Sequence, residues 1–159
     1  MRGPMATKSE AGEKLIASNK KAYHDYFILQ KYEAGLSLRG TEVKSLRDGK
    51  ANLKDAYVLF KGGEAFLFNA NISPYTHGNL QNHEPERSRK LLLHRKEIEK
   101  AREQVVEKGL TVVPLRLYFK GGRIKVEIAV VRGKKLYDKR ETEKRKEAVR
   151  EAAVAMKQR

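Results

Sequence analysis

Residues 111–131 have the sequence TVVPLRLYFKGGRIKVEIAVV, which carries the clearest secondary-structure signal in the chain. From Arg123 to Val131 apolar and polar side chains alternate, which is the period of a strand with one buried face. Gly121-Gly122 between two such runs is typical of a tight hairpin. Pro114 cannot donate a ladder hydrogen bond, so we expect it at a sheet edge or a β-bulge. The stretch therefore predicts an antiparallel hairpin and a mainly β fold.

Weaker signals of the same kind predict about four more strands upstream. Residues 26–29 form a first expected strand, and residues 32–39 alternate between apolar and polar. Residues 52–60 and 64–71 flank Gly62-Gly63, as in a second hairpin. About six short strands in one small domain favour a closed or nearly closed barrel, which also hides the sheet edges.

Two helices and one long loop complete the expected domain. Residues 41–47 have apolar side chains at helical spacing before Gly49, and residues 91–108 have the same spacing before Gly109. Residues 73–88 predict a long irregular connection, and such connections in compact domains are often functional.

Charge is the strongest indication of a partner. The chain has 159 residues with 35 Lys and Arg against 20 Asp and Glu, a net charge of +15. Nucleic acid is the first candidate to neutralise this excess, because Lys and Arg displace counterions from phosphates. An anionic membrane surface is the second, although no apolar run approaches the roughly 20 residues of a membrane span.

The residue types make catalysis an unattractive explanation. Cysteine is absent, which excludes disulfides and thiolate zinc sites and suits a reducing cytoplasm. The four histidines are scattered, no phosphate-binding glycine loop is present, and Glu33 and Glu42 have no leaving-group pocket beside them. We therefore expect that the protein is not an enzyme and that it has no cofactor and no metal site. An isolated carboxylate in a basic protein has another use, since it can accept hydrogen bonds from bases or ribose.

Residues 132–159 differ in kind from the rest of the chain. They hold eleven Lys or Arg and five Asp or Glu, for a net charge of +6, and only a narrow apolar stripe. Isolated short helices are marginal in water, so we expect a tail that is disordered alone and helical when bound. The expected organisation is a disordered extension at residues 1–18, an RNA-binding barrel at residues 19–131, and this basic tail.

The cations fall into groups, two of which lie next to the aromatic residues Tyr23 and Tyr137. Aromatic rings stack on unpaired bases while Lys and Arg hold phosphates. The grouping therefore predicts an RNA-binding surface rather than a basic surface that only keeps the protein soluble. The groups are Lys20 and Lys21; Lys44, Arg47 and Lys50; Arg87, Arg89 and Lys90; and Arg132, Lys134 and Lys135.

Several short motifs occur in one order along the chain. They are Asn19-Lys20-Lys21, Tyr32-Glu33-Ala34-Gly35, Gly40-Thr41-Glu42-Val43-Lys44-Ser45-Leu46-Arg47, Gly49-Lys50-Ala51-Asn52, Arg89-Lys90-Leu91-Leu92-Leu93, Gly133-Lys134-Lys135 and Asp138-Lys139-Arg140. Together, from about Asn19 to the C-terminus, they resemble the SsrA-binding protein family, also called small protein B.

That resemblance implies an OB-like antiparallel β-barrel with flanking helices and a disordered basic tail. It implies binding to the tRNA-like domain of transfer-messenger RNA and delivery to the vacant A site of a ribosome stalled on truncated mRNA. The tail would probe the empty mRNA channel near the decoding centre, which leads to rescue and degradation tagging. The elongation factor that delivers aminoacyl-tRNA would be an indirect partner.

The resemblance also implies site residues. Asn19 and Glu33 would hydrogen-bond RNA, Leu93 would support packing, and Lys125 would lie on the RNA-facing side. The complete expected RNA-binding set is Asn19, Lys20, Lys21, Tyr23, Glu33, Lys44, Arg47, Lys50, Arg89, Lys90, Leu93 and Lys125. The expected ribosome-facing set is Gly133, Lys134, Lys135, Tyr137, Asp138, Lys139, Arg140, Lys144, Arg145 and Lys146.

Tyr137 departs from family members that carry His at this position. A stacking role on a base is compatible with tyrosine at this position, whereas a role that depends on a titrating imidazole is not.

Two other classes of protein remain open from the sequence. A structural ribosomal protein or general RNA binder also fits a basic barrel with a basic tail, and an RNA-modifying enzyme would need a convergent acid/base set.

Overall fold

The computed structural model describes residues 12–75 and 82–134, which form nine strands and three helices. In chain order the elements are β1 (Glu13–Ser18), α1 (Lys20–Asp25), β2 (Tyr26–Leu36), α2 (Gly40–Arg47), β3 (Ala51–Asn52), β4 (Tyr57–Lys61), β5 (Glu64–Phe68), β6 (Asn71–Ile72), β7 (Arg89–Leu92), α3 (Arg95–Lys108), β8 (Thr111–Lys120) and β9 (Arg123–Gly133).

Six of the strands form a ring. The order of the large sheet is β1-β8-β4-β5-β7-β2-β9, and β8 also pairs with β9, so the strands from β8 round to β9 return to their start. All pairings are antiparallel, but β4 and β8 share a single paired position, Val58 with Val112. The expected mainly β fold with about six barrel strands is confirmed, as a ring that is less than strictly closed.

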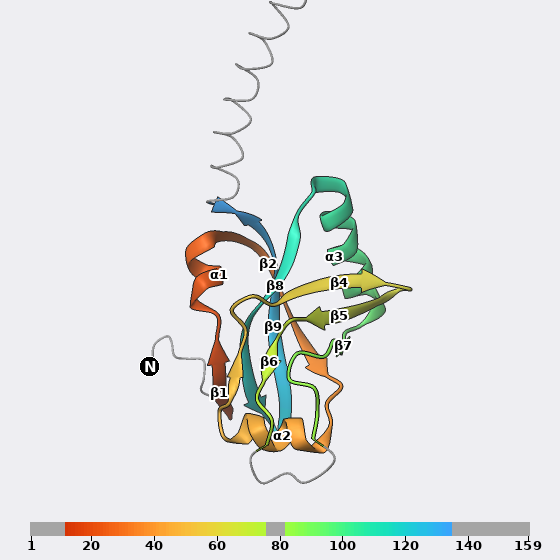
Figure 1. Ribbon diagram of the computed structural model, residues 1–159. Coiled ribbons are helices and arrows are strands. Elements are labelled where there is room, and N and C mark those ends of the chain that lie inside the picture. The colour runs from red at the N-terminus through yellow and green to blue at the C-terminus, as the bar shows by residue number, and fades with distance from the viewer. Residues whose placement is uncertain (1–11, 76–81, 135–159) are drawn as a thin grey trace, which may run out of the picture.

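Three helices surround this ring. Figure 1 shows α2 across the lower end of the ring, and α1 and α3 on opposite sides of its upper end. The interior is filled by the inward-facing residues of the strands, which include Ala34, Leu67, Leu91 and Ile128 at 1% exposure or less. A smaller second core lies under α1, where Ala22 packs against the outer face of β8 and β9.

The β8–β9 hairpin has the expected form. Gly121 and Gly122 adopt φ angles of 57° and 76°, the left-handed region that glycine enters without a steric penalty. The pairing register shifts between Pro114 and Arg116, which confirms a β-bulge at the proline. The Gly62-Gly63 hairpin between β4 and β5 is also confirmed.

Several expected boundaries are wrong. Residues 13–18 are not a disordered extension, since they form β1 along β8. The Glu13 carboxylate also forms an ion pair with the Arg116 guanidinium of β8 at 3.3 Å. Residues 26–36 form one strand rather than two, with a bulge between Ile28 and Gln30. Because β1 belongs to the sheet, the folded body begins at least six residues before Asn19.

Two other elements differ from expectation, because pairing with strands distant in sequence overrides the local pattern of apolar residues. Residues 52–60 are divided between β3 and β4. The helix expected from residue 91 begins instead at Arg95, where the backbone N–H of His94 donates to the Glu97 carboxylate at 3.2 Å. Residues 89–92 form β7, which lies between β5 and β2. Of the expected loop, residues 73–75 and 82–88 have no strand or α-helix, and residues 76–81 lie outside the described residues.

The assignment of β7 predicts a large difference between two neighbouring leucines. Leu91 is 1% exposed inside the ring and Leu92 is 53% exposed on its outer side. Leu91→Ala should lower the free energy of unfolding by about 2–5 kcal/mol, since it removes buried methylenes and leaves a cavity. The matched control Leu92→Ala should change it by within about 0.5 kcal/mol. Urea unfolding of both variants is the measurement, and equal losses would contradict this strand assignment.

Candidate nucleic-acid interface

A groove with a volume of about 730 Å³ lies where β7, the β4–β5 turn and the start of α3 meet β2 and β9. Its lining brings together four residues of the expected RNA-binding set, contributed by three separate segments of the chain. They are Glu33 on β2, Lys90 on β7, Leu93 after β7 and Lys125 on β9.

Glu33 lies on the outer face of β2 and is held by two donors. The Tyr118 hydroxyl donates to its Oε2 at 2.5 Å, and the Lys120 ammonium donates to the same oxygen at 3.2 Å. Burial alone would raise the pKa of Glu33, but the hydrogen bonds from Tyr118 and Lys120 outweigh it and lower the pKa below its ordinary value. The carboxylate is therefore charged at neutral pH.

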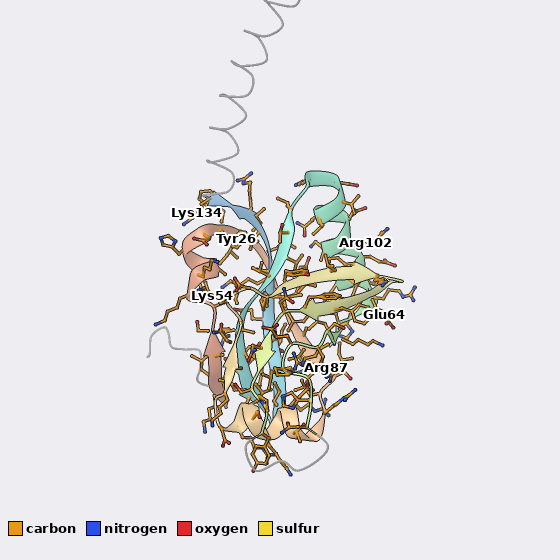
Figure 2. All side chains as sticks on the ribbon, viewed as in Figure 1. Tyr26, Lys54, Glu64, Arg87, Arg102 and Lys134 are labelled. Carbon is orange, nitrogen blue, oxygen red and sulfur yellow. The ribbon has the colours of Figure 1, made fainter. Side chains whose placement is uncertain are left out.

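The charges that line the groove are balanced. Lys90, Arg95 and Lys125 lie among the lining residues together with Glu64 and two other glutamates, Glu33 and Glu97. Lys90 forms an ion pair with Glu64 at 2.9 Å, and Figure 2 shows Glu64 at the outer edge of the β4–β5 hairpin. A row of phosphates would need a cationic excess, so this groove is better suited to base or ribose groups that offer hydrogen-bond donors.

Asn19 has a structural role in the protein. Its side chain is buried, and its carbonyl oxygen accepts from the Ala22 backbone N–H at 3.1 Å, which caps α1. Its amide donates to the carbonyl oxygens of Pro114 at 2.8 Å and Leu53 at 3.2 Å. The expected hydrogen bond between Asn19 and RNA stays a prediction, and in this structure protein groups contact both polar atoms of the side chain.

Arg89, another residue of the expected RNA-binding set, has a fully buried side chain. Its guanidinium donates to the Glu42 carboxylate at 2.7 Å and to the Ala70 carbonyl oxygen at 2.7 Å. Glu42 is itself fully buried and also accepts from Arg87 at 2.7 Å. Figure 2 shows Arg87 near the α2 end of the ring, where the three side chains join α2 to β7. A guanidinium enclosed in this way has no face left for a phosphate.

The other expected cations are exposed but do not form one patch. Lys20, Lys21 and Tyr23 lie on α1, whereas Lys44 and Arg47 lie on α2 at the opposite end of the ring, followed by Lys50 (Figure 1). The Lys21 ammonium is 3.5 Å from Asp55, and Lys44 lies over the Tyr75 ring at 5.6 Å.

Of the ribosome-facing set, only the first two residues are described. Gly133 ends β9, and the Lys134 ammonium lies 5.2 Å from the centre of the half-exposed Phe27 ring. Figure 2 shows Lys134 at the end of the molecule opposite α2. Lys135, Tyr137, Asp138, Lys139, Arg140, Lys144, Arg145 and Lys146 lie outside the described residues.

Tyr118 and Lys120, which hold Glu33, are not in the expected RNA-binding set. Counting outward from Gly121-Gly122 pairs Tyr118 with Lys125 in the β8–β9 hairpin, and that register could have been read from the sequence. Their approach to Glu33 could not, because it depends on the pairing of β2 with β9.

Residues 12–75 and 82–134 contain no group of three or more potential metal-ligating side chains. None of the helices in that part of the chain is long and apolar enough to cross a membrane. A ring of antiparallel strands, a charge-balanced groove and cations at both ends define a small β-barrel protein of the nucleic-acid-binding class.

Comparison with known proteins gives the family. A model described as "SmpB protein" matches residues 16–158. The SsrA-binding protein of Geotalea uraniireducens (strain Rf4) is 64% identical over 92% of this chain and 97% of its own length. The SsrA-binding protein of Trichodesmium erythraeum (strain IMS101) is 55% identical over 97% of this chain and 99% of its own. The chain belongs to the SmpB family, so the resemblance seen in the sequence is confirmed.

A solved structure agrees with this assignment. It is described as "tmRNA-SmpB: a journey to the center of the bacterial ribosome" and has a TM-score of 0.64 and 48% sequence identity. The match covers 74% of this chain and 83% of that chain.

Burial of Glu42 predicts a defined pH dependence of stability. Burial alone would raise the pKa of Glu42, but hydrogen bonds from Arg87, the Arg39 backbone and Arg89 lower it below the ordinary 4.5. Its contribution is therefore complete above pH 4.5 and is lost as the pH falls through the lowered native pKa.

Glu42→Gln should lower the free energy of unfolding at pH 7 by about 3–5 kcal/mol, because it leaves buried guanidinium groups without a counter-charge. The loss should shrink as the pH falls below 4.5. Glu64→Gln, which breaks a half-exposed pair, should cost less than about 1 kcal/mol at either pH. Urea unfolding over a pH series measures both, and a pH-independent loss for Glu42→Gln would contradict this account.

Proposed function

We propose that this protein binds the tRNA-like domain of transfer-messenger RNA and delivers it to the vacant A site of ribosomes stalled on truncated mRNA. Rescue of the ribosome and tagging of the nascent chain for degradation follow. The observation that carries the proposal is the match to SsrA-binding proteins over nearly the whole chain. The tmRNA-SmpB structure extends the argument to a ribosomal setting.

The folded body would supply the contact with the tRNA-like domain. One groove holds Glu33, Lys90, Leu93 and Lys125, although these residues come from three separate segments of the chain. The bound RNA would meet a carboxylate and two ammonium groups at this groove, which combines base or ribose contacts with phosphate contacts. In this role the protein is a binding module, and the chemistry belongs to the ribosome.

The basic tail would test whether the mRNA channel is empty. Residues 132–159 carry +6 of the net charge of +15. The channel is walled by ribosomal RNA phosphates, so a cationic segment binds the walls directly and intact mRNA excludes it sterically. Folding coupled to binding costs affinity but allows the segment to enter only where space permits. The elongation factor that delivers aminoacyl-tRNA would be an indirect partner, and the setting would be the cytoplasm.

Removing the tail should separate these two activities. β9 ends at Gly133, so a chain that stops after Lys134 keeps every described strand. We expect its affinity for the isolated tRNA-like domain to stay within about threefold of the full chain, with a smaller salt dependence because cations are lost. Peptide tagging on stalled ribosomes should be abolished. Loss of binding to the isolated domain would contradict the proposed division of labour.

Glu33→Ala should weaken RNA binding although it makes the protein more basic. The carboxylate accepts hydrogen bonds that phosphate-binding cations cannot replace, so we expect a loss of about 10-fold. Glu64→Ala is the matched control, because it releases Lys90 in the same groove and should preserve or raise affinity. Titration of labelled RNA at fixed salt measures both. A gain in affinity for Glu33→Ala would show that this carboxylate only repels RNA.

A further inference from the structure

The outer side of strands β4, β5 and β7 carries apolar side chains that do not belong to the core of the ring. Side chains alternate along these strands, so the neighbours of the buried core residues point outward. Figure 1 shows the β4–β5 hairpin reaching outward below α3. Three of the five outward apolar residues are aromatic, and we term the set the aromatic face. Its members are Tyr57 and Leu59 on β4, Phe66 and Phe68 on β5, and Leu92 on β7.

The strand register arranges the aromatic face in rows. Leu59 lies opposite Phe66, and Phe66 lies opposite Lys90, so one row crosses all three strands. Tyr57 lies opposite Phe68, and their rings stack with centroids 5.6 Å apart and planes at 8°. In the part of the chain that the structure describes, no second ring and no cation stacks on the partly exposed Phe66. Phe66 is therefore the ring of this face that lacks a stacking partner.

The aromatic face is open to solvent and is flanked by lysines. Leu59 is 49% exposed and Leu92 is 53% exposed. Lys90 follows Phe66 in its row, and its ammonium is paired with Glu64 at 2.9 Å. Lys61 is exposed and lies two residues beyond Leu59 on β4, so it points to the same side. Rings for stacking and lysines for phosphates are the two features that sites for single-stranded nucleic acid combine.

The aromatic face adjoins the groove that holds Glu33. Lys90 and Leu92 line that groove and also lie on the outer side of β7. An RNA strand that leaves the groove at Lys90 would next meet Phe66. Barrels of the OB type bind oligonucleotides on a strand face, which is the kind of surface found here. A second copy of this chain is a poor occupant, because two bodies with a net charge of +15 repel each other.

We propose that the aromatic face binds unpaired nucleotides of the RNA, with a base stacked on Phe66 and the ammonium groups of Lys61 and Lys90 at the neighbouring phosphates. This inference rests on the proposed function, because it takes the RNA to be the tRNA-like domain. It adds a contact outside the groove that tolerates any base, since every base has a flat face to stack.

Phe66→Leu removes the ring and keeps an apolar side chain at this position. We expect the full-length variant to bind the tRNA-like domain about 10-fold more weakly, the loss expected for one base–aromatic stack. The dependence of affinity on salt should not change, because no cation is lost. Phe66→Tyr keeps a ring and should stay within about threefold of wild type. Phe119→Leu makes the same change on β8, outside the aromatic face, and should bind as wild type does.

A fluorescent reporter tests stacking directly. The chain has no tryptophan, so Phe66→Trp places a single indole on the aromatic face. A base that stacks on this indole should quench its emission when the tRNA-like domain is added, whereas Phe119→Trp should keep its emission. Replacing the stacked nucleotide by an abasic one keeps the phosphate and should abolish the quenching. Thermal unfolding verifies that each variant is folded at the assay temperature.

The outcomes separate the two levels of inference. If the wild-type chain does not bind the tRNA-like domain, the proposed function fails. If wild type binds and Phe66→Leu binds within about twofold of it, the stacking contact alone is overturned. Quenching that is absent, or that survives every abasic replacement, would also overturn it. A Phe66→Leu variant that binds the RNA normally but binds ribosomes weakly would assign the face to another partner and would overturn the contact too.

Discussion

The antiparallel pairing of β2 with β9 decides where the groove residues and the start of the tail lie. It joins segments nearly a hundred residues apart, from Tyr26 opposite Gly133 to Gly35 opposite Lys125. Through this ladder Glu33 lies close enough to β8 to accept from Tyr118, and Lys125 lines the same groove. Loss of the ladder would disperse the groove and would also detach the start of the tail from the body.

Two glutamates that both form ion pairs differ in how much of each side chain is exposed. Glu42 is enclosed with Arg87 and Arg89, so its charge is used to join α2 to β7. Glu33 is fixed by Tyr118 and Lys120 but keeps part of its surface in solvent. The pKa of each carboxyl is lowered, so both are charged at neutral pH, and exposure to solvent is what distinguishes them. A perturbed pKa marks a functional site only where the group can also be reached.

Local patterns predicted the elements that local chemistry determines. The glycine-pair hairpins and the β-bulge at Pro114 follow from backbone constraints within a few residues. The patterns fail where long-range contacts decide: β1 lacks a clear alternation and becomes a strand beside β8, and residues 91–92 of β7 continue the helical spacing of the residues that follow them. Motif resemblance placed Glu33 and Lys125 in the expected set, and the structure brings them together. It could not separate exposed cations from the buried Arg89, because burial is a property of the completed fold.

β9 continues without a break from the groove into the first two residues of the tail, Arg132 and Gly133. At about 3.3 Å per residue, the eight steps from Lys125 to Gly133 span roughly 26 Å of ladder-bound backbone. A flexible linker would leave the distance between the groove and the tail variable, whereas this strand fixes the distance from Lys125 to Gly133. Under the proposed function, the strand thus fixes the distance between an RNA bound in the groove and the end of β9.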